Sequence, residues 1–219
     1  MGLTKEKENS SRRPSDWAYI ARFDRKDLPS LEEMARHIRE THDVDMIQDF
    51  NRKCEQKLKL REQDQRQTTA VLDNGVEIQS VTKAGDLVVN TGLRHCINII
   101  LGQTSARFSH FGMSPQSPTP AAVTDTALSN ERIADRVVLA WAESVGMRMF
   151  FGGISRQDDV DSPAGLEEIG VYNGSAAGAV LLNRTIFRDN DITRNKPGFT
   201  NVQSAPMIVS AVIEFCPKA

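Results

Sequence analysis

The order of polar and apolar residues divides the chain into three parts. Residues 1–14 are polar and include Ser10, Ser11 and Pro14. Such a composition favours a chain end without fixed structure, so we expect residues 1–29 to form a flexible N-terminal segment. Helical periods follow over residues 30–67, and from residue 68 the pattern changes to the short runs typical of strands. The sequence therefore predicts a flexible segment (1–29), a helical arm (30–67) and a β-rich body (68–219).

The first helix of the arm is predicted to begin near Ser30. Ser30 and Glu33 form an S-x-x-E capping box, and Leu28 and Met34 stand at the two positions of a hydrophobic staple. One apolar face follows, made of Leu31, Met34, Ala35 and Ile38. The pattern falters at residues 41–45, where we expect the first helix to end.

A second helix is predicted from Asp45, which can cap it with Gln48 three residues on, to about residue 67. Its apolar stripe consists of Ile47, Phe50, Cys54 and Leu58. A stripe this narrow on an otherwise charged helix must lie against something, either the body or another subunit. Our hypothesis is that these four residues form an assembly interface between subunits.

Short apolar runs from residue 68 onward predict an antiparallel β structure. Residues 68–72 and 76–81 flank the turn Asp73-Asn74-Gly75 and predict a tight hairpin, and residues 133–141 and 147–154 predict a longer one. The other runs typical of strands are residues 87–90, 108–114, 169–172, 180–187 and 207–215. Because short turns connect most of these runs, the sequence predicts a sandwich or barrel rather than alternating β-α units.

One helix is predicted inside the body. Leu93, Cys96, Ile97, Ile100 and Leu101 recur at helical spacing, and Gly102 supplies a stop signal. We interpret this segment as a short buried helix that belongs to the core. The predicted fold class is therefore α+β, an N-terminal helical arm followed by a mainly antiparallel β-sandwich body with one short buried helix.

Composition narrows the classes of partner. The net charge of −2 and the pI of about 6.1 provide no positive field to hold nucleic acid or an anionic membrane, so we expect protein partners. Cys54, Cys96 and Cys216 are far apart and odd in number, which argues against a disulfide framework and a zinc site. Neither a signal-peptide pattern nor an apolar run near the ~20 residues of a membrane span is found. We expect synthesis in the cytoplasm and a soluble product.

The histidines and cysteines do not form a known catalytic pattern. His37 and His42 are five residues apart, so on a helix they point in different directions, unlike the pair of a zinc protease. His95 precedes Cys96 directly, and neighbours on a helix do not face each other. Cys96 also belongs to an apolar stripe, where burial would raise the pKa of a thiol. We expect no nucleophile there.

The acidic residues likewise fail as sites. The runs Asp158 to Asp161 and Asp189 to Asp191 lack the spaced ligands, the turn glycine and the distal Glu of a calcium loop, so we expect solvated turns. Glu167 and Glu168 are adjacent at the start of a predicted strand and therefore face opposite ways. The sequence predicts no catalytic residue, no metal site and no cofactor.

The stretch from Asn90 to Phe215 resembles a group of tailed-phage virion proteins, namely tail-fibre, baseplate and particle-surface proteins with small β-sandwich bodies. Three motifs carry the resemblance. They are Asn90-Thr91-Gly92-Leu93; the run from Phe108 to Gly112 followed by Pro118 to Glu131; and Glu168-Ile169-Gly170-Val171-Tyr172-Asn173 followed by Gly178 and Leu181-Leu182-Asn183-Arg184. The chain departs from the family at Gly112-Met113-Ser114, where a pair of glycines is often found.

The resemblance implies a structural component of a virus particle, located in the tail, baseplate, neck or head surface and without catalytic residues. We therefore expect a virion protein made in the host cytoplasm, forming a homo-oligomer and contacting copies of itself and other virion proteins. A host-receptor-binding module is the alternative, with residues 115–126 or 188–198 as its contact loop. An enzyme acting on host glycans is the third possibility, which requires a cleft with two suitably spaced carboxylates.

Overall fold

A computed structural model describes residues 17–62, 69–114, 120–129, 131, 136–155, 167–187 and 206–214 of the chain. The helices are η1 (Arg25–Asp27), α1 (Leu28–Thr41), α2 (Val44–Glu62) and α3 (Asn90–Ile100). The strands are β1 (Trp17–Arg22), β2 (Ala70–Val71), β3 (Glu77–Ile78), β4 (Ser80–Val88), β5 (His110–Ser114), β6 (Val137–Val138), β7 (Trp141–Val145), β8 (Arg148–Ser155), β9 (Glu168–Tyr172), β10 (Asn183–Ile186) and β11 (Met207–Glu214). The described residues thus confirm a mixed α+β fold.

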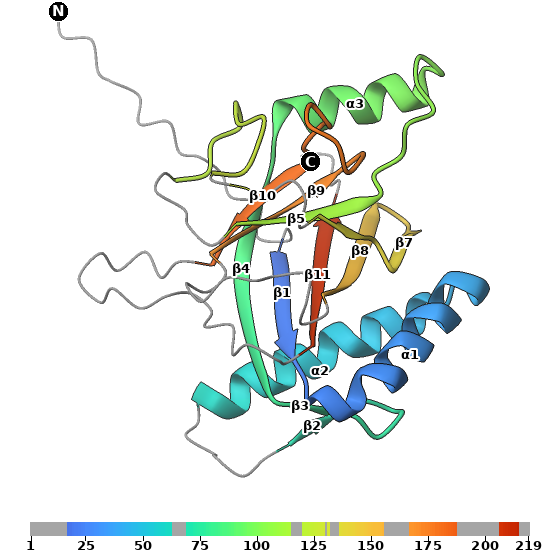
Figure 1. Cartoon of the computed structure of the whole chain (residues 1–219), viewed down its shortest axis with the longest axis vertical. Coiled ribbons are helices and arrows are strands. Elements are labelled where there is room, and N and C mark those ends of the chain that lie inside the picture. The colour runs from blue at the N-terminus through green and yellow to red at the C-terminus, as the bar shows by residue number, and fades with distance from the viewer. Residues whose placement is uncertain are drawn as a thin grey trace, which may run out of the picture.

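Nine strands form a single antiparallel sheet in the order β6-β5-β9-β10-β4-β1-β11-β8-β7. Its longest strand, β4, is shared by two parts of the sheet, because residues 80–85 pair with β1 and residues 86–88 pair with β10. The sheet therefore curls at β4 into a half-barrel (Figure 1). One curled sheet takes the place of the two separate sheets expected for a sandwich.

The two edge strands, β6 and β7, follow each other along the chain. The amide of Leu139 donates to the carbonyl of Ser109 beside β5 (2.8 Å), and the amide of Ala140 donates to the carbonyl of Gly152 in β8 (2.6 Å). Residues 137–145 therefore run from one edge of the sheet to the other. This crossing draws the two edges together and encloses the apolar interior.

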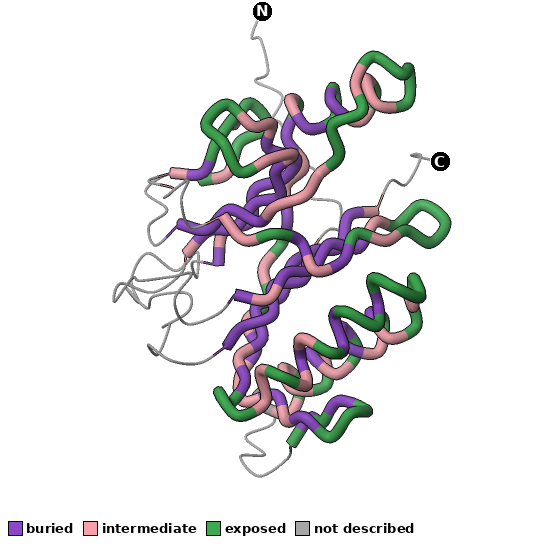
Figure 2. Tube along the Cα trace, turned by 45° about the vertical axis from the view of Figure 1, so that its right-hand side comes forward, coloured by how far each residue is buried: buried purple, intermediate pink, exposed green. Residues whose placement is uncertain are grey.

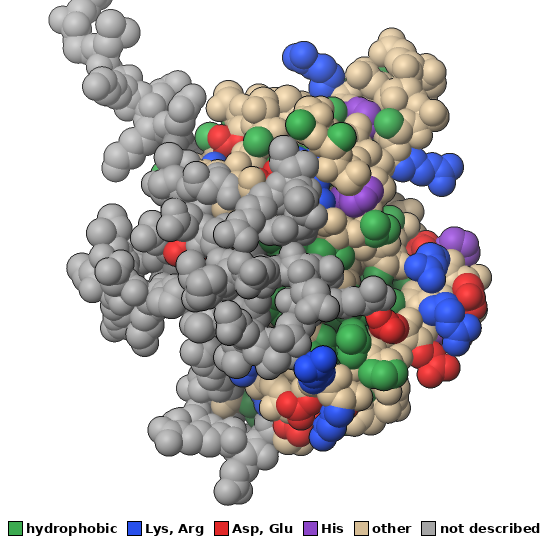
Figure 3. All heavy atoms as spheres, viewed as in Figure 1, with side chains coloured by type: hydrophobic (Ala, Val, Ile, Leu, Met, Phe, Trp, Pro, Cys, Tyr) green, Lys and Arg blue, Asp and Glu red, His purple; other side chains and the backbone are tan. Residues whose placement is uncertain are grey.

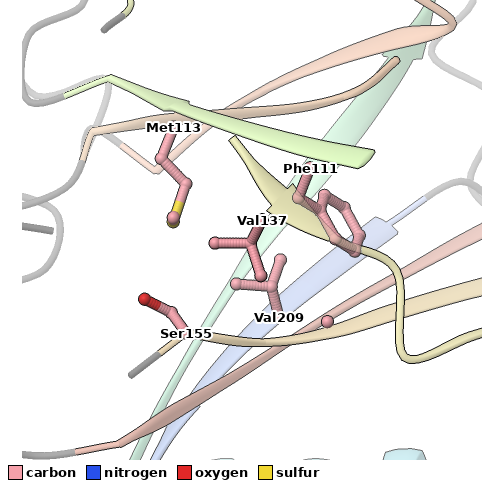
Figure 4. A pocket seen from close by; sticks show the side chains of 6 residues that line it. Phe111, Met113, Val137, Ser155 and Val209 are labelled. Carbon is pink, nitrogen blue, oxygen red and sulfur yellow. The ribbon is translucent and has the colours of Figure 1, made fainter. Parts of the chain in front are cut away.

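Side chains from both parts of the sheet fill that interior. Figure 4 shows Phe111, Met113, Val137, Ser155 and Val209 pointing toward one another between β5 and β6 on one side and β8 and β11 on the other. These side chains leave no space for a water molecule between them. The interior at this place is a packed core rather than a ligand cavity.

Two neighbouring inner strands, β1 and β11, are buried on both faces. In β1, Ala18 and Ile20 face the interior, while Tyr19 and Ala21 pack on the other side of the sheet with residues of α1 and α2. Figure 2 shows these strands buried along their length and the two helices buried on one side only. The helices thus cover one outer face of the sheet.

The division into arm and body is therefore wrong. Residues 17–22, expected within a flexible end, form β1 between β11 and β4, where they pair with both neighbours. The predicted arm packs on β1 from outside, so α1 and α2 belong to the same core as the sheet. Sequence reasoning missed β1 because a strand that is buried on both faces has no polar alternation to reveal it.

The first two helices follow the predicted faces but not the predicted caps. Leu31, Met34, Ala35 and Ile38 are buried, as expected. However, α1 begins at Leu28, two residues before the predicted start, and its N-cap residue Asp27 makes no side-chain hydrogen bond. For α2, the carboxylate of Asp43 rather than Asp45 accepts a hydrogen bond from the amide of Met46 (3.0 Å).

The predicted hairpins are confirmed in part. β2 pairs with β3 across the turn that contains Gly75, whose φ of 82° suits glycine. The longer hairpin joins β7 to β8 through Gly146, but residues 143–145, expected in the connection, belong to β7. Residues 133–135 of its predicted first strand lie outside the described residues.

The third helix, α3, is present, but its predicted burial is wrong. Leu93, Ile97, Ile100 and Leu101 are exposed, with 82% of Ile100 accessible to solvent. The helix instead packs on the body through its two buried residues, Gly92 and His95, and of the predicted stripe only the half-buried Cys96 contacts the core. A Cβ atom at Gly92 would come within 2.5 Å of the Cα of Leu182, so only glycine allows this close seat. The helix is therefore attached by its smallest residue and turns its apolar stripe outward.

Candidate functional site

A buried polar cluster forms where residues 120–129 and Glu131, here called the crossing segment, lie against β9 and β10. At its centre is Arg184 of β10, whose side chain is 2% exposed. Its guanidinium donates to the carboxylates of Asp125 (2.7 Å) and Glu168 and to the hydroxyl of Ser129 (3.0 Å). Glu168 is fully buried and also accepts a hydrogen bond from the amide of Ser129 (2.8 Å). Arg184 and Glu168 thus hold the crossing segment against two strands.

A second ion pair fixes the end of the same segment. Glu131 accepts hydrogen bonds from Arg136 Nε (2.8 Å) and Nη2 (3.0 Å), a two-pronged pair in which both side chains are almost completely buried. The guanidinium lies 3.7 Å from the ring centroid of Tyr172, and the Tyr172 hydroxyl donates to Glu131 (2.9 Å). The amide of Leu128 in turn donates to that hydroxyl (3.0 Å). Tyr172 of β9 therefore connects the segment to the sheet.

A third group joins β10 to β4 beneath the first two. Asp86 accepts hydrogen bonds from the side-chain amide of Asn183 (Nδ2) and from the hydroxyl of Thr185, both at 2.6 Å. Asn183 Oδ1 accepts from the backbone amide of Val171 (2.9 Å). These buried groups satisfy one another across three neighbouring strands, which fixes the register of β4, β10 and β9.

Two glycines make room for the cluster. A Cβ atom at Gly170 would lie 2.6 Å from the carbonyl oxygen of Asn183, and one at Gly112 would overlap the carboxylate of Glu131 and the ring of Tyr172. Any larger residue at either position would push the network off the sheet.

Residues from the three motifs singled out in the sequence meet in this cluster. The residues concerned come from separate stretches of the chain and include Gly112, Asp125, Glu131, Glu168, Gly170, Tyr172 and Arg184. The remaining motif, Asn90 to Leu93, seats α3 beside them, where the Thr91 hydroxyl donates to the carbonyl of Leu181 (3.3 Å). The residues of these motifs therefore form one buried polar cluster, here called the buried lock, which holds the crossing segment and α3 on the sheet.

The chemistry of the cluster is that of a structural lock. Burial opposes the charge of Arg184, but its hydrogen bonds to Glu168 and Asp125 outweigh burial and raise the guanidinium pKa. Burial and the neighbouring charge of Glu131 raise the pKa of Tyr172. Burial also opposes the charge of Arg136, but its hydrogen bonds to Glu131 outweigh burial and raise the pKa of this guanidinium too. The two arginines therefore stay charged and the Tyr172 hydroxyl stays protonated, so none of the three side chains exchanges a proton near neutral pH.

The stripe hypothesised as an assembly interface lies in the core of its own chain. Ile47, Phe50 and Cys54 are 0 to 1% exposed, and Leu58 packs against the same cluster. Phe50 meets the ring of Trp141 edge-on at a centroid distance of 6.4 Å. The hypothesis is therefore wrong, because the outer face of the sheet already buries this stripe. Of the two surfaces that the sequence allows for this stripe, the body or another subunit, the structure shows the body.

The other residues considered for chemistry are dispersed. His37 lies 3.5 Å from Asp43, and His42 lies 2.9 Å from Glu143 of β7, in two separate contacts. His95 Nε2 is 2.7 Å from the carbonyl oxygen of Ala106. The Cys96 side chain is half-buried, and burial raises the pKa of its thiol. No pair of these residues forms a nucleophile and base.

The sequence also predicts no metal site, solvated turns at two aspartate runs and no membrane-spanning segment. Within the described ranges, no group of three or more His, Cys, Asp or Glu side chains could hold a metal ion. Both aspartate runs, 158–161 and 189–191, lie outside those ranges, as does the expected loop at 188–198. Among the described helices, none is both long and apolar enough to cross a membrane.

Comparisons with models of protein families, with curated proteins and with solved structures found no match to this chain.

Proposed function

We propose that this protein is a non-catalytic structural component of a virus particle of the tailed-phage type, contacting copies of itself and other virion proteins. The observation that carries the proposal is the convergence of the resembling motifs. They form a buried lock that holds a crossing segment and α3 on the sheet, with side chains tied to one another rather than directed into a cleft. Such an arrangement suits a rigid building block whose work is done by its surfaces.

The lock also bears on the alternative of receptor binding. Residues 120–126, part of the expected contact loop, are exposed for the most part but are anchored through Asp125 to Arg184. In addition, the Asp125 carboxylate accepts a hydrogen bond from the amide of Ala122 (2.7 Å). An anchored segment of this kind is better suited to a fixed contact between virion proteins than to an adaptable receptor loop, so assembly remains the preferred function.

The test is mass spectrometry of virus particles purified from cells that carry the gene. We expect the protein to copurify with particles through a density gradient and to be present in several copies per particle. A protein of similar size expressed in the same cells, but with no role in the particle, serves as the control for trapping. Absence of the chain from intact, infectious particles would refute the proposed function.

A further inference from the structure

The outward stripe of α3 reverses the usual orientation of an amphipathic helix. Successive residues are rotated by about 100°, so Ile97 lies about 160° around the helix from His95, one of the two residues that seat α3 on the body. Leu93, Ile100 and Leu101 share the side of Ile97, and all four are exposed. Figure 1 places α3 at the opposite end of the molecule from α1 and α2. The four residues, here called the α3 stripe, therefore form an apolar surface of their own.

Charged side chains are sparse around this surface. In Figure 3, positive and negative side chains mix over α1, whereas few charged side chains are in view over α3. Along α3 itself the only Lys, Arg, Asp or Glu is Arg94, which is exposed. An apolar stripe with so little charge beside it is typical of a protein contact surface.

The α3 stripe is symmetric about Ile97. Leu93 stands four residues before Ile97 and Leu101 stands four residues after it. When two such helices cross in opposite directions at Ile97, Leu93 of each copy meets Leu101 of the other. A surface of this kind complements itself across a twofold axis, as an isologous contact requires.

Charge favours the same antiparallel arrangement. In an antiparallel pair, Arg94 of one copy lies opposite Ile100 of the other, at the last turn of the partner helix. The carboxyl end of a helix carries a partial negative charge, which attracts a cation. A parallel pair would instead bring the two Arg94 side chains together, which is unfavourable.

We infer that the α3 stripe pairs with the same stripe of a second copy of this chain, antiparallel and centred on Ile97. This inference names the surface for the self-association in the proposed function, and it rests on that function for its place in a particle. The four side chains offer a few hundred Å², well below the ~800 Å² per partner of a standard stable interface. The pair is therefore weak in dilute solution and gains strength where several contacts act together, as in an assembly.

Disulfide trapping tests the geometry. In a background with Cys96→Ala and Cys216→Ala, Ile97→Cys places its thiol on the twofold axis, so oxidation is expected to give a covalent dimer. Leu93→Cys alone should not give one, because four residues on either side of the axis separate the two positions by about 12 Å along the helices. A bridge requires Cα atoms within about 7 Å. A mixture of Leu93→Cys and Leu101→Cys chains should form the mixed dimer.

Two further variants provide a reference for the rate of disulfide trapping. Met147→Cys, on a residue 55% exposed against 54% for Ile97, reports collision alone. We expect at least tenfold faster trapping at position 97 than at position 147. Arg94→Glu, added to Ile97→Cys, should slow trapping several-fold because it reverses the charge near the partner's helix end without altering the apolar residues.

Several outcomes would overturn the inference. Equal trapping at positions 97 and 147 would mean that no pair forms, and efficient trapping of Leu93→Cys with itself would mean a parallel pair. Binding of the protein to phosphatidylglycerol vesicles that is lost in Ile97→Asp, without trapping at position 97, would identify a lipid surface as the occupant. If the chain is present in particles but position 97 is not trapped there or in solution, only this inference fails. If position 97 is trapped but particles lack the chain, the proposed function fails instead.

Discussion

Replacement of Arg184 by Met removes the cation from the centre of the buried lock while keeping an unbranched side chain in its place. Glu168 then remains fully buried without its main counter-charge, although the amide of Ser129 still donates to it. Asp125 loses the same partner, but its carboxylate is 21% exposed and can be solvated. The cost of the change therefore lies mainly at Glu168.

The size of the effect follows from that asymmetry. Removing one partner of a buried ion pair costs about 3 to 5 kcal/mol of stability, because it leaves an uncompensated charge in the interior. The hydrogen bond retained by Glu168 and the exposure of Asp125 place Arg184→Met at the lower end, at about 3 kcal/mol. For a chain of this size the melting temperature should fall by about 6 to 12 °C. A loss of this size is a large part of the about 5 to 15 kcal/mol that stabilises a typical domain.

Urea unfolding followed by circular dichroism measures the change. Arg36→Met is the matched control, because the carboxylates that Arg36 contacts among the described residues are exposed and lie on α1, and its loss should alter stability by no more than about 0.5 kcal/mol. The double variant Arg184→Met with Glu168→Gln should recover at least about 1 kcal/mol relative to Arg184→Met, because it removes the buried negative charge.

Two results would contradict this prediction. If Arg184→Met is as stable as the Arg36→Met control, the lock contributes nothing to folding. If the effects of Arg184→Met and Glu168→Gln simply add in the double variant, the two side chains are not energetically coupled, and their contact has no role in holding the crossing segment.

Three other results are expected. Phe50→Ala should lower the stability of the isolated chain by about 3 to 5 kcal/mol in urea unfolding, and an unchanged midpoint would place the α2 stripe outside the core. A chain that lacks residues 1–67 has lost β1 and both helices that cover it, so it should give a disordered circular dichroism spectrum. A β-rich spectrum with a cooperative unfolding transition would instead show that the body folds alone. Burial and the charge of Arg136 lower the pKa of His110, so the unfolded chain binds the proton more readily and stability should fall as the pH drops below about 6.5. His110→Gln should flatten this pH dependence, and an identical profile in the variant would contradict the assignment.

The sequence was a good guide to elements with one buried face or a run of apolar residues. It predicted β9 and β11 nearly to their ends and the buried face of α1, because the period of apolar residues follows directly from which side of an element is covered. It also brought forward the motif residues of the lock, although only as a resemblance and without a role for any of them.

The tertiary structure decided which surfaces meet. Periodicity shows that Ile47, Phe50 and Cys54 require cover, but the sheet and a second subunit would satisfy the same pattern equally well. The same ambiguity reversed the reading of α3, whose apolar side faces solvent because the close seat of Gly92 fixes the rotation of the helix. Arg184 and Asp125 meet across 59 residues of chain, and contacts of that range leave no mark on local spacing. Local sequence determines the preferences of each segment, whereas the partner of each buried surface is chosen only when all segments compete for the same core.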